Sequence, residues 1–136
     1  MRKVFTIIFL FLLLSGCKKT IDKLKENAVI SAMTDGQWVI RSFSKNGTII
    51  TSDFDGYKFQ FYSNYTVDAI KNNSVEKTGT WNGDPATMTI TANFPNVVSP
   101  LSQINGNWHI DDNSWTFVVA SQNAGSDVKT MRLEKL

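Results

Sequence analysis

The sequence predicts an all-β fold, an antiparallel meander of about eight or nine short strands that follows an export signal and a short helix. Two observations predict this class. From Gly36 onward the apolar residues recur with period two, as in strands that bury one face. Turn-forming pairs such as Asn46-Gly47 and Asp55-Gly56 separate these runs at close spacing. Short strands joined by tight turns are typical of a small barrel or a sandwich.

The first sixteen residues have the composition of an export signal. Arg2 and Lys3 precede an apolar run over residues 4–14, which is too short to cross a bilayer. The run ends in Leu14-Ser15-Gly16-Cys17, and Cys17 is the only cysteine in the chain. This quartet resembles the lipobox of bacterial lipoproteins, in which cleavage leaves a lipid-modified cysteine as the first residue. The resemblance implies a signal peptide over residues 1–16 and lipid attachment at Cys17.

Residues 17–33 are expected to form a lipidated tether that ends in a short helix. Residues 24–33 are mostly good helix formers without Gly or Pro, and Asp35-Gly36 ends the run. Four apolar residues share one face of this helix: Leu24, Ala28, Val29 and Ala32. Two or three acyl chains on Cys17 hold a protein stably at a membrane, whereas a single chain holds it only marginally.

The strand domain is expected to cover residues 34–136. Its strongest run is residues 86–92, where Ala86, Met88, Ile90 and Ala92 alternate with threonines. Similar alternation marks residues 57–62 and 114–120. The predicted strands are residues 37–44, 47–52, 57–62, 65–70, 75–81, 86–92, 107–111, 114–120 and 128–135.

The alternation assigns bulky residues to the buried face of these strands. The inward residues are Trp38, Ile40, Tyr57, Phe59, Phe61, Tyr65, Val67, Met88, Ile90, Trp115, Phe117, Val119, Met131 and Leu133. Tyr62 and Phe43 are expected to be exposed. An eight-stranded barrel has an interior that side chains just fill or that holds one small ligand. The inward residues suit a solid core at least as well as an apolar cavity.

Residues 93–107 interrupt the strand pattern. Pro95 and Pro100 disfavour a central strand, yet the segment keeps several apolar residues. Its length is unusual for a connection inside a small domain. We expect a lid over one end of the barrel, with an irregular strand as the alternative.

Gly36-Gln37-Trp38 opens the first predicted strand directly after the short helix. This arrangement resembles the Gly-x-Trp signature of lipocalins, and the chain from residue 34 to 136 resembles the small lipocalin-like domains of Gram-negative lipoproteins. The supporting segments are residues 59–66, Gly79-Thr80-Trp81 and residues 131–136. The resemblance implies a closed antiparallel barrel and an arginine of the last strand over Trp38. Arg132 is the only candidate, and alternation directs it away from the core.

The charge balance excludes a nucleic-acid-binding surface. The chain has 14 Lys and Arg against 12 Asp and Glu. Loss of residues 1–16 removes Arg2 and Lys3, and the formal charge of the remainder is zero. Proteins that bind nucleic acid carry a concentrated excess of basic residues. We therefore expect no nucleic-acid partner.

No set of residues suggests catalysis or a metal. His109 is the only histidine, on the expected outward face of a strand, and catalysis would require a nucleophile and an orienting partner around it. Residues 53–56 begin like a calcium loop, but Tyr57, Lys58 and Asn64 stand where that loop requires a ligand, a glycine and a glutamate. A cluster of His or Cys is also missing from the sequence. We expect no enzymatic activity, no cofactor and no metal.

These observations predict a membrane-anchored, lipocalin-like lipoprotein that binds a small apolar ligand in the mouth of its barrel. The expected ligand-binding residues are Tyr57, Phe59, Phe61, Met88, Trp115 and Phe117, with residues 94–104 as a gate. The alternative is a protein-interaction module of the cell envelope, which has a filled core and acts through its outer surface or a sheet edge. An apolar cavity of about 300 Å³ or more would favour the ligand. The resemblance implies attachment in the bacterial envelope, most often at the outer membrane.

Overall fold

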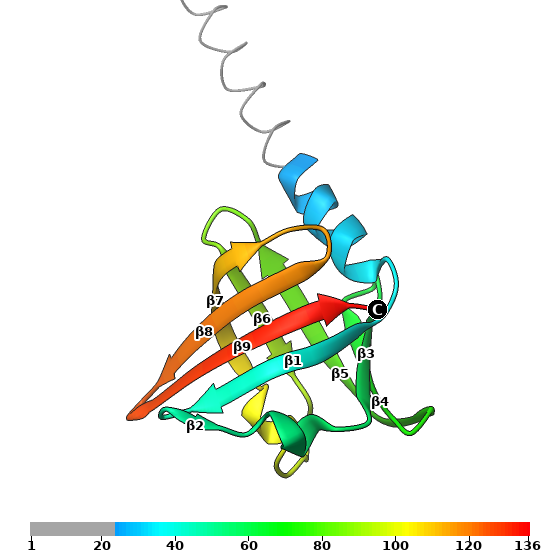
Figure 1. The fold of residues 1–136 in the computed structure, drawn as a ribbon. Coiled ribbons are helices and arrows are strands. Elements are labelled where there is room, and N and C mark those ends of the chain that lie inside the picture. Colours follow the sequence, from blue (N-terminus) through cyan, green and yellow to red (C-terminus); the bar gives the residue numbers. More distant parts are fainter. Residues whose placement is uncertain (1–23) are drawn as a thin grey trace, which may run out of the picture.

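The computed structural model describes residues 24–136, which form a closed antiparallel barrel with one extra strand and a helix across one end (Figure 1). The expected signal peptide over residues 1–16 and the lipid site at Cys17 lie outside the described residues. The strands are β1 Trp38–Lys45, β2 Thr48–Ile49, β3 Tyr57–Phe61, β4 Thr66–Lys71, β5 Ser74–Asp84, β6 Thr89–Asn93, β7 Gly106–Asn113, β8 Phe117–Ala124 and β9 Asp127–Lys135. Two short 3-10 helices are η1 Thr51–Phe54 and η2 Leu101–Gln103. The predicted meander barrel is confirmed.

The order of the strands gives the barrel two distinct ends. From β3 to β9 each strand pairs with its neighbour in sequence, so successive connections alternate between the ends. We call one the helix end: it carries the helix of residues 24–34 and the connections 62–65, 85–88 and 114–116. We call the other the plug end: it carries the turns at 46–47, 72–73 and 125–126 and the long segment 94–105.

Strands β1 and β9 close the barrel. Their pairing runs from Trp38 and Lys135 to Lys45 and Lys129, with a bulge between Ile40 and Ser42. On its other side β1 meets β3 only where Trp38 pairs with Phe59. The gap that follows is covered by η1, whose Phe54 ring lies 4.9 Å from the ring of Phe43. The barrel is therefore paired along the whole of one side of β1, whereas the other side is held by the single pair with β3, the short pairing of Ser44 and Lys45 with β2, and the packing of η1.

Three buried tryptophans tie the barrel to its connections. The indole nitrogen of Trp38 donates to the carbonyl of Met33 at 2.9 Å, at the end of the helix. The indole nitrogen of Trp81 donates to the carbonyl of Tyr62, and that of Trp108 donates to the carbonyl of Ile104. A buried indole keeps its apolar contacts at no cost when its N–H finds an acceptor. Each tryptophan therefore fixes a strand to a segment outside the barrel wall.

The helix of residues 24–34 covers the helix end of the barrel. Val29, Ile30 and Met33 pack against the core, whereas Leu24 is 63% exposed and Ala28 is also exposed, so the buried face is rotated relative to the predicted one. The ammonium of Lys135 donates to the carbonyl of Ala32 at 2.9 Å and lies 5.0 Å from the centroid of the Trp38 ring. A lysine thus occupies the position at which the lipocalin resemblance implies an arginine.

Segment 94–105 closes the plug end of the barrel. This agrees with the predicted lid and not with the alternative of an irregular strand. Phe94, Leu101 and Ile104 are buried in the core. The side chain of Asn105 bonds both the N–H and the carbonyl of Phe94, and the amide of Gln122 donates to the carbonyls of Asn105 and Asn107. These bonds fix the segment as a plug.

Four side-chain placements were predicted wrongly at element ends or irregularities. Phe43, expected to be exposed, is buried because the bulge in β1 shifts the alternation by one residue. Tyr65 and Met88 have φ of +66° and +52° and lie in turns, where both are more than one-third exposed. Trp115 lies in the turn before β8 and is 59% exposed.

The alternation of β8 is also the reverse of the prediction. Val118 and Ala120 face the core, so Phe117 and Val119 face outward. The guanidinium of Arg132 lies 4.4 Å from the centroid of the Phe117 ring on this outer face, as the predicted outward direction of Arg132 requires.

Candidate functional site

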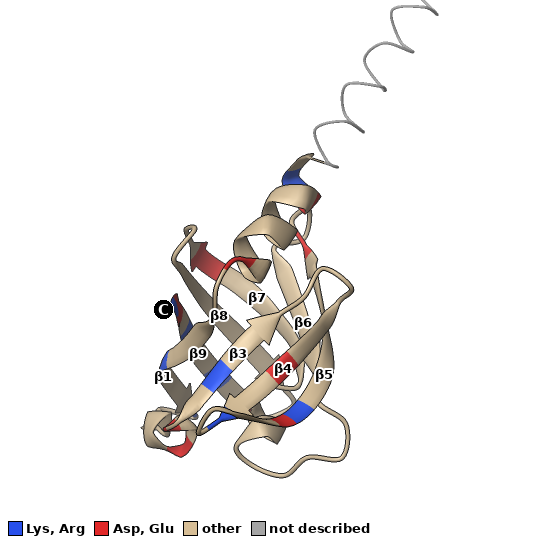
Figure 2. Cartoon of the chain, turned by 90° about the vertical axis from the view of Figure 1, so that its right-hand side faces the viewer, with Lys and Arg blue, Asp and Glu red and all other residues tan. Residues whose placement is uncertain are grey.

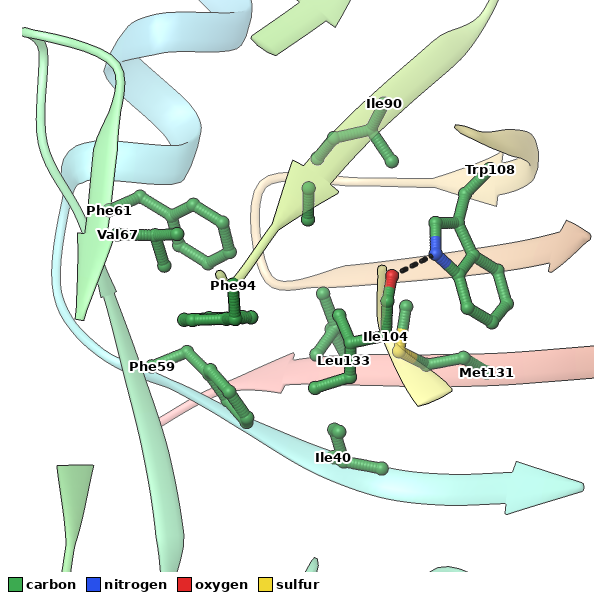
Figure 3. Close-up of a pocket in the computed structure, with 11 residues that line it drawn as sticks. Ile40, Phe59, Phe61, Val67, Ile90, Phe94, Ile104, Trp108, Met131 and Leu133 are labelled. Carbon is green, nitrogen blue, oxygen red and sulfur yellow. Dashed lines mark hydrogen bonds between the residues drawn. The ribbon is translucent and has the colours of Figure 1, made fainter. Parts of the chain in front are cut away.

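The interior of the barrel is filled by side chains. The space left between them is only about 30 Å³, room for about one water molecule (Figure 3). Its walls are Ile40, Phe59, Phe61, Val67, Ile90, Ala92, Phe94, Ile104, Trp108, Met131 and Leu133. Small-molecule sites are about ten times larger or more. The middle of the barrel is therefore a packed core.

Three of the six predicted ligand-binding residues lie together on β3. Tyr57, Phe59 and Phe61 are buried and face inward, in the phase that the sequence predicts. The rings of Tyr57 and Phe59 are stacked with centroids 6.2 Å apart. Phe59 and Phe61 line the small interior space, so in this structure they act as core residues.

Tyr57 carries the polar group of this row. Its hydroxyl donates to the carboxylate of Glu76 on β5, and the ammonium of Lys71 lies 5.0 Å from its ring centroid. Burial, followed by the hydrogen bond and the negative charge of Glu76, raises the pKa of the Tyr57 phenol to about 12. The phenol therefore remains neutral through the physiological range.

The other three predicted residues are not brought together with β3. Phe117 lies on the outer face beneath Arg132, and Trp115 projects from the turn between β7 and β8. Met88 lies in the turn between β5 and β6, where its carbonyl accepts a hydrogen bond from the N–H of Ile110 at 2.7 Å. The six residues do not form one site.

A larger hollow of about 270 Å³ lies between the helix and the helix end of the barrel. Ala28, Val29 and Ala32 face it from the helix. The barrel rim contributes apolar side chains from four strands and one turn: Trp38, Ile90, Ile110 and Val118 from the strands and Met88 from the turn. Polar groups at its edge come from Lys25, Asp84, Asn113 and Ser114. This mouth hollow is the candidate binding site.

Sequence reasoning found part of the mouth hollow. Ala28, Val29 and Ala32 belong to the predicted helix face, and Met88 was predicted as a ligand contact. Ile110 and Val118 were missed. The signal for Val118 was present, since Val118 and Ala120 form an apolar phase of their own, in competition with Phe117 and Val119. The signal for Ile110 was its place two residues after Trp108, on the same face.

His109, Asp111 and Ser121 form a polar cluster on the outer face of the barrel. The imidazole Nδ1 of His109 lies 3.0 Å from the carboxylate of Asp111, which also accepts a hydrogen bond from Ser121. These bonds, with that of His109 the larger cause, lower the pKa of Asp111. The carboxylate lies between the serine and the imidazole. A catalytic triad requires the imidazole between the serine and the carboxylate, so this order does not activate the serine.

Charged groups do not gather into a functional cluster in the described part of the chain. Within residues 24–136, no group of three or more His, Cys, Asp or Glu side chains is placed to hold a metal ion. Lysines, arginines and carboxylates are scattered over the strands that Figure 2 presents. The pairs of Arg41 and Arg132 with Glu134 lie on the outer surface, where ion pairs contribute little. Over the same residues, no helix is both long enough and apolar enough to span a bilayer.

Comparisons with known proteins support the fold alone. No family model matches the chain, and no curated protein matches it. Among solved structures, the chain is similar to the crystal structure of a DUF4847 family protein from Bacteroides vulgatus, with a TM-score of 0.53 and 15% sequence identity. The match covers 78% of this chain and 96% of that one. The barrel is thus an architecture seen by crystallography in a bacterial protein.

Proposed function

We propose that the chain is a lipoprotein of the bacterial cell envelope, anchored by lipid at the outer membrane. Its barrel binds a small apolar ligand in the mouth hollow. The observation that carries this proposal is the 270 Å³ hollow at the helix end, because its wall is mostly apolar and its volume lies just below the lower limit of about 300 Å³ for small-molecule sites, which suits a small ligand. The bound molecule is held by burial of apolar surface and not by charge. No catalytic step is assigned.

The anchoring part of the proposal depends on Leu14-Ser15-Gly16-Cys17. Cells that express the chain with a labelled fatty acid should incorporate the label, and Cys17→Ala should abolish incorporation and release the protein from the membrane fraction. Processing should also be blocked by globomycin, an inhibitor of the lipoprotein signal peptidase. An unlabelled, globomycin-insensitive native protein contradicts the anchor.

The ligand part is tested with a substitution that fills the mouth hollow. Ala32 lines the hollow, whereas its neighbour Ser31 is exposed and lies outside it. With Nile red as an apolar fluorescent probe, Ala32→Phe should weaken binding about tenfold or more, and the matched control Ser31→Phe should bind as the unaltered protein does. Equal binding by both variants contradicts a site in the hollow. Native mass spectrometry of protein purified from its own membrane then identifies any retained molecule.

The second candidate is a protein-interaction module of the envelope without a ligand. The filled interior favours it, because the space of about 30 Å³ leaves no ligand cavity inside the barrel itself. In that case Nile red does not bind, Ala32→Phe has no effect on function, and substitutions on the outer surface remove activity.

A further inference from the structure

The exposed apolar side chains of the described residues divide by kind between the two ends of the barrel. Ile49, Val75, Val98 and Val128 lie at the plug end and are all aliphatic. The exposed apolar residues of the helix end are Leu24, Tyr62, Tyr65, Met88, Trp115 and Leu136. The aromatic residues among these exposed side chains, Tyr62, Tyr65 and Trp115, therefore all lie at the helix end.

Trp115 is presented at the helix end by a well-bonded turn. The N–H of Ser114 donates to Phe117, the N–H of Thr116 donates to the hydroxyl of Ser114, and Thr116 in turn accepts from the N–H of Lys135. The turn lies beside the helix, since Ser114 and Ala28 line the same hollow (Figure 1). The indole of Trp115 is 59% exposed on this ordered turn, so most of its surface faces away from the barrel.

The chain leaves the barrel toward Cys17 at this same end. Leu24, the first described residue, is seven residues after Cys17. Seven residues reach at most about 25 Å even when fully extended. A lipid on Cys17 therefore keeps the bilayer surface within a short distance of the helix end, while the plug end lies on the far side of the domain.

Charge does not select an anionic surface for this end. Among residues 24–136, the carboxylates at this end outnumber the ammonium groups: Glu26, Asp35, Asp84 and Asp112 against Lys25 and Lys135. Tryptophan and tyrosine, in contrast, concentrate at the membrane–water interface because their rings are apolar and their tips are polar. The chemistry of the helix end thus fits the interface of a bilayer and does not depend on acidic lipids.

We propose that the helix end of the barrel rests on the surface of the bilayer, with Trp115 inserted at the level of the lipid headgroups. The inference rests on the proposed lipid anchor, which brings the bilayer to this end. In this orientation the mouth hollow opens beside the membrane and the plug end faces away from it.

The tryptophans of the chain allow a direct test. Trp38, Trp81 and Trp108 are at most 3% exposed, so Trp115 is the only one of the four tryptophans in residues 24–136 that can contact lipid. The lipidated protein, purified from cells and reconstituted in phosphatidylcholine vesicles, is compared with Trp115→Phe in the same vesicles. Their emission difference reports Trp115. Brominated phosphatidylcholine should remove most of this difference, and added phosphatidylglycerol should not increase the loss.

A tryptophan at the plug end provides the matched control. Val98 is 83% exposed on the plug segment, so Val98→Trp in the Trp115→Phe background carries an exposed indole at the opposite end. Its emission should be unchanged by brominated lipid. Quenching of the two indoles to the same extent, or of neither, overturns the proposed orientation.

The anchor itself is measured on the same vesicles by flotation. Protein that floats while Trp115 remains unquenched retains the anchor and overturns the contact of the barrel with the bilayer. Protein that does not float contradicts the anchor and, with it, the orientation.

Discussion

Tyr57, Gln122 and the buried tryptophans show how single residues satisfy polar groups in a filled barrel. Within residues 24–136, every side-chain N or O atom shielded from solvent has a hydrogen-bond partner. Loss of one partner leaves the other buried and unpaired, which costs more than the bond itself contributes. Replacing any one of these hydrogen-bonding residues by an apolar residue is therefore expected to lower the free energy of unfolding markedly.

The ionisation of Tyr57 should make stability fall at high pH. Its phenol ionises at pH 10.0 in the unfolded chain and at about 12 in the folded one. The folded state thus favours the neutral form, and the resulting stability is complete below pH 10 and is lost as the pH rises toward 12. The difference in tyrosinate absorbance between the unaltered chain and Tyr57→Phe isolates the phenol of Tyr57, because Tyr62, whose pKa is also raised by its hydrogen bond to Asp68, is present in both. A phenol that ionises near pH 10.0 at this position contradicts the assignment.

Glu76→Gln tests the cause of that shift. The variant removes the negative charge beside Tyr57 and should lower the pKa of the phenol part of the way, because burial is the larger cause. A full return to the ordinary value would assign the whole shift to Glu76.

Gln122→Leu should loosen the plug. The substitution keeps the approximate volume but removes the two hydrogen bonds to Asn105 and Asn107. We expect a loss of about 1–3 kcal/mol in the free energy of unfolding, measured by urea titration. Asn123→Leu, at the next and exposed position of β8, is the control and should change stability by less than about 0.5 kcal/mol. Equal losses in the two variants would contradict the role of the bonds.

At the scale of elements, period two predicted nine strands, and pairing decided which face each strand buries. In β8 both phases are apolar, so alternation alone does not choose between them. The pairs Val118 with Leu133 and Ala120 with Met131 settle it, because directly paired residues lie on the same face and β9 buries Met131 and Leu133. The bulge in β1 and the turn at Met88 likewise depend on pairing with other strands, which the alternation of one strand does not reveal.

Gly79→Ala should damage the contact between β5 and the plug. A Cβ at Gly79 would lie 2.4 Å from the carbonyl oxygen of Asn93 and 2.8 Å from the ring of Phe94. Backbone cannot move aside cheaply, so we expect a loss of about 1–3 kcal/mol or more. Thr80→Ala, at the adjacent exposed position, should be nearly neutral in the same thermal or urea measurement. A neutral Gly79→Ala would contradict the close approach.

At the scale of the whole molecule, the barrel was predictable and the mouth hollow was not. The local sequence pattern predicted the strands, the inward-facing residues of β3 and the helix. The hollow exists only where the helix, the start of β1 and the ends of β6, β7 and β8 converge. Such a convergence depends on tertiary distances, so the sequence identified the helix face, Met88 and the inward direction of Trp38 and Ile90, but not that these residues meet Ile110 and Val118 around one hollow.

The closing pair of the barrel should form late in folding. Ile40 on β1 pairs with Leu133 on β9, far along the chain, whereas Val67 on β4 pairs with nearby Gly79. Ile40→Ala and Val67→Ala each remove buried methyl groups and should destabilise by about 1–4 kcal/mol. Stopped-flow kinetics should show that Ile40→Ala mainly accelerates unfolding and Val67→Ala mainly slows folding. The reverse partition contradicts late closure.

The end of β9 lies beside the start of β1, where the N–H of Leu136 donates to the carbonyl of Gln37 at 2.9 Å. A fluorescent protein or affinity tag fused after Leu136 would thus crowd the helix and the entrance of the hollow. The tight turn at Asn72 and Asn73 projects from the opposite end, and both residues are exposed. Epitopes for imaging or capture belong at that turn, where they leave the rim untouched.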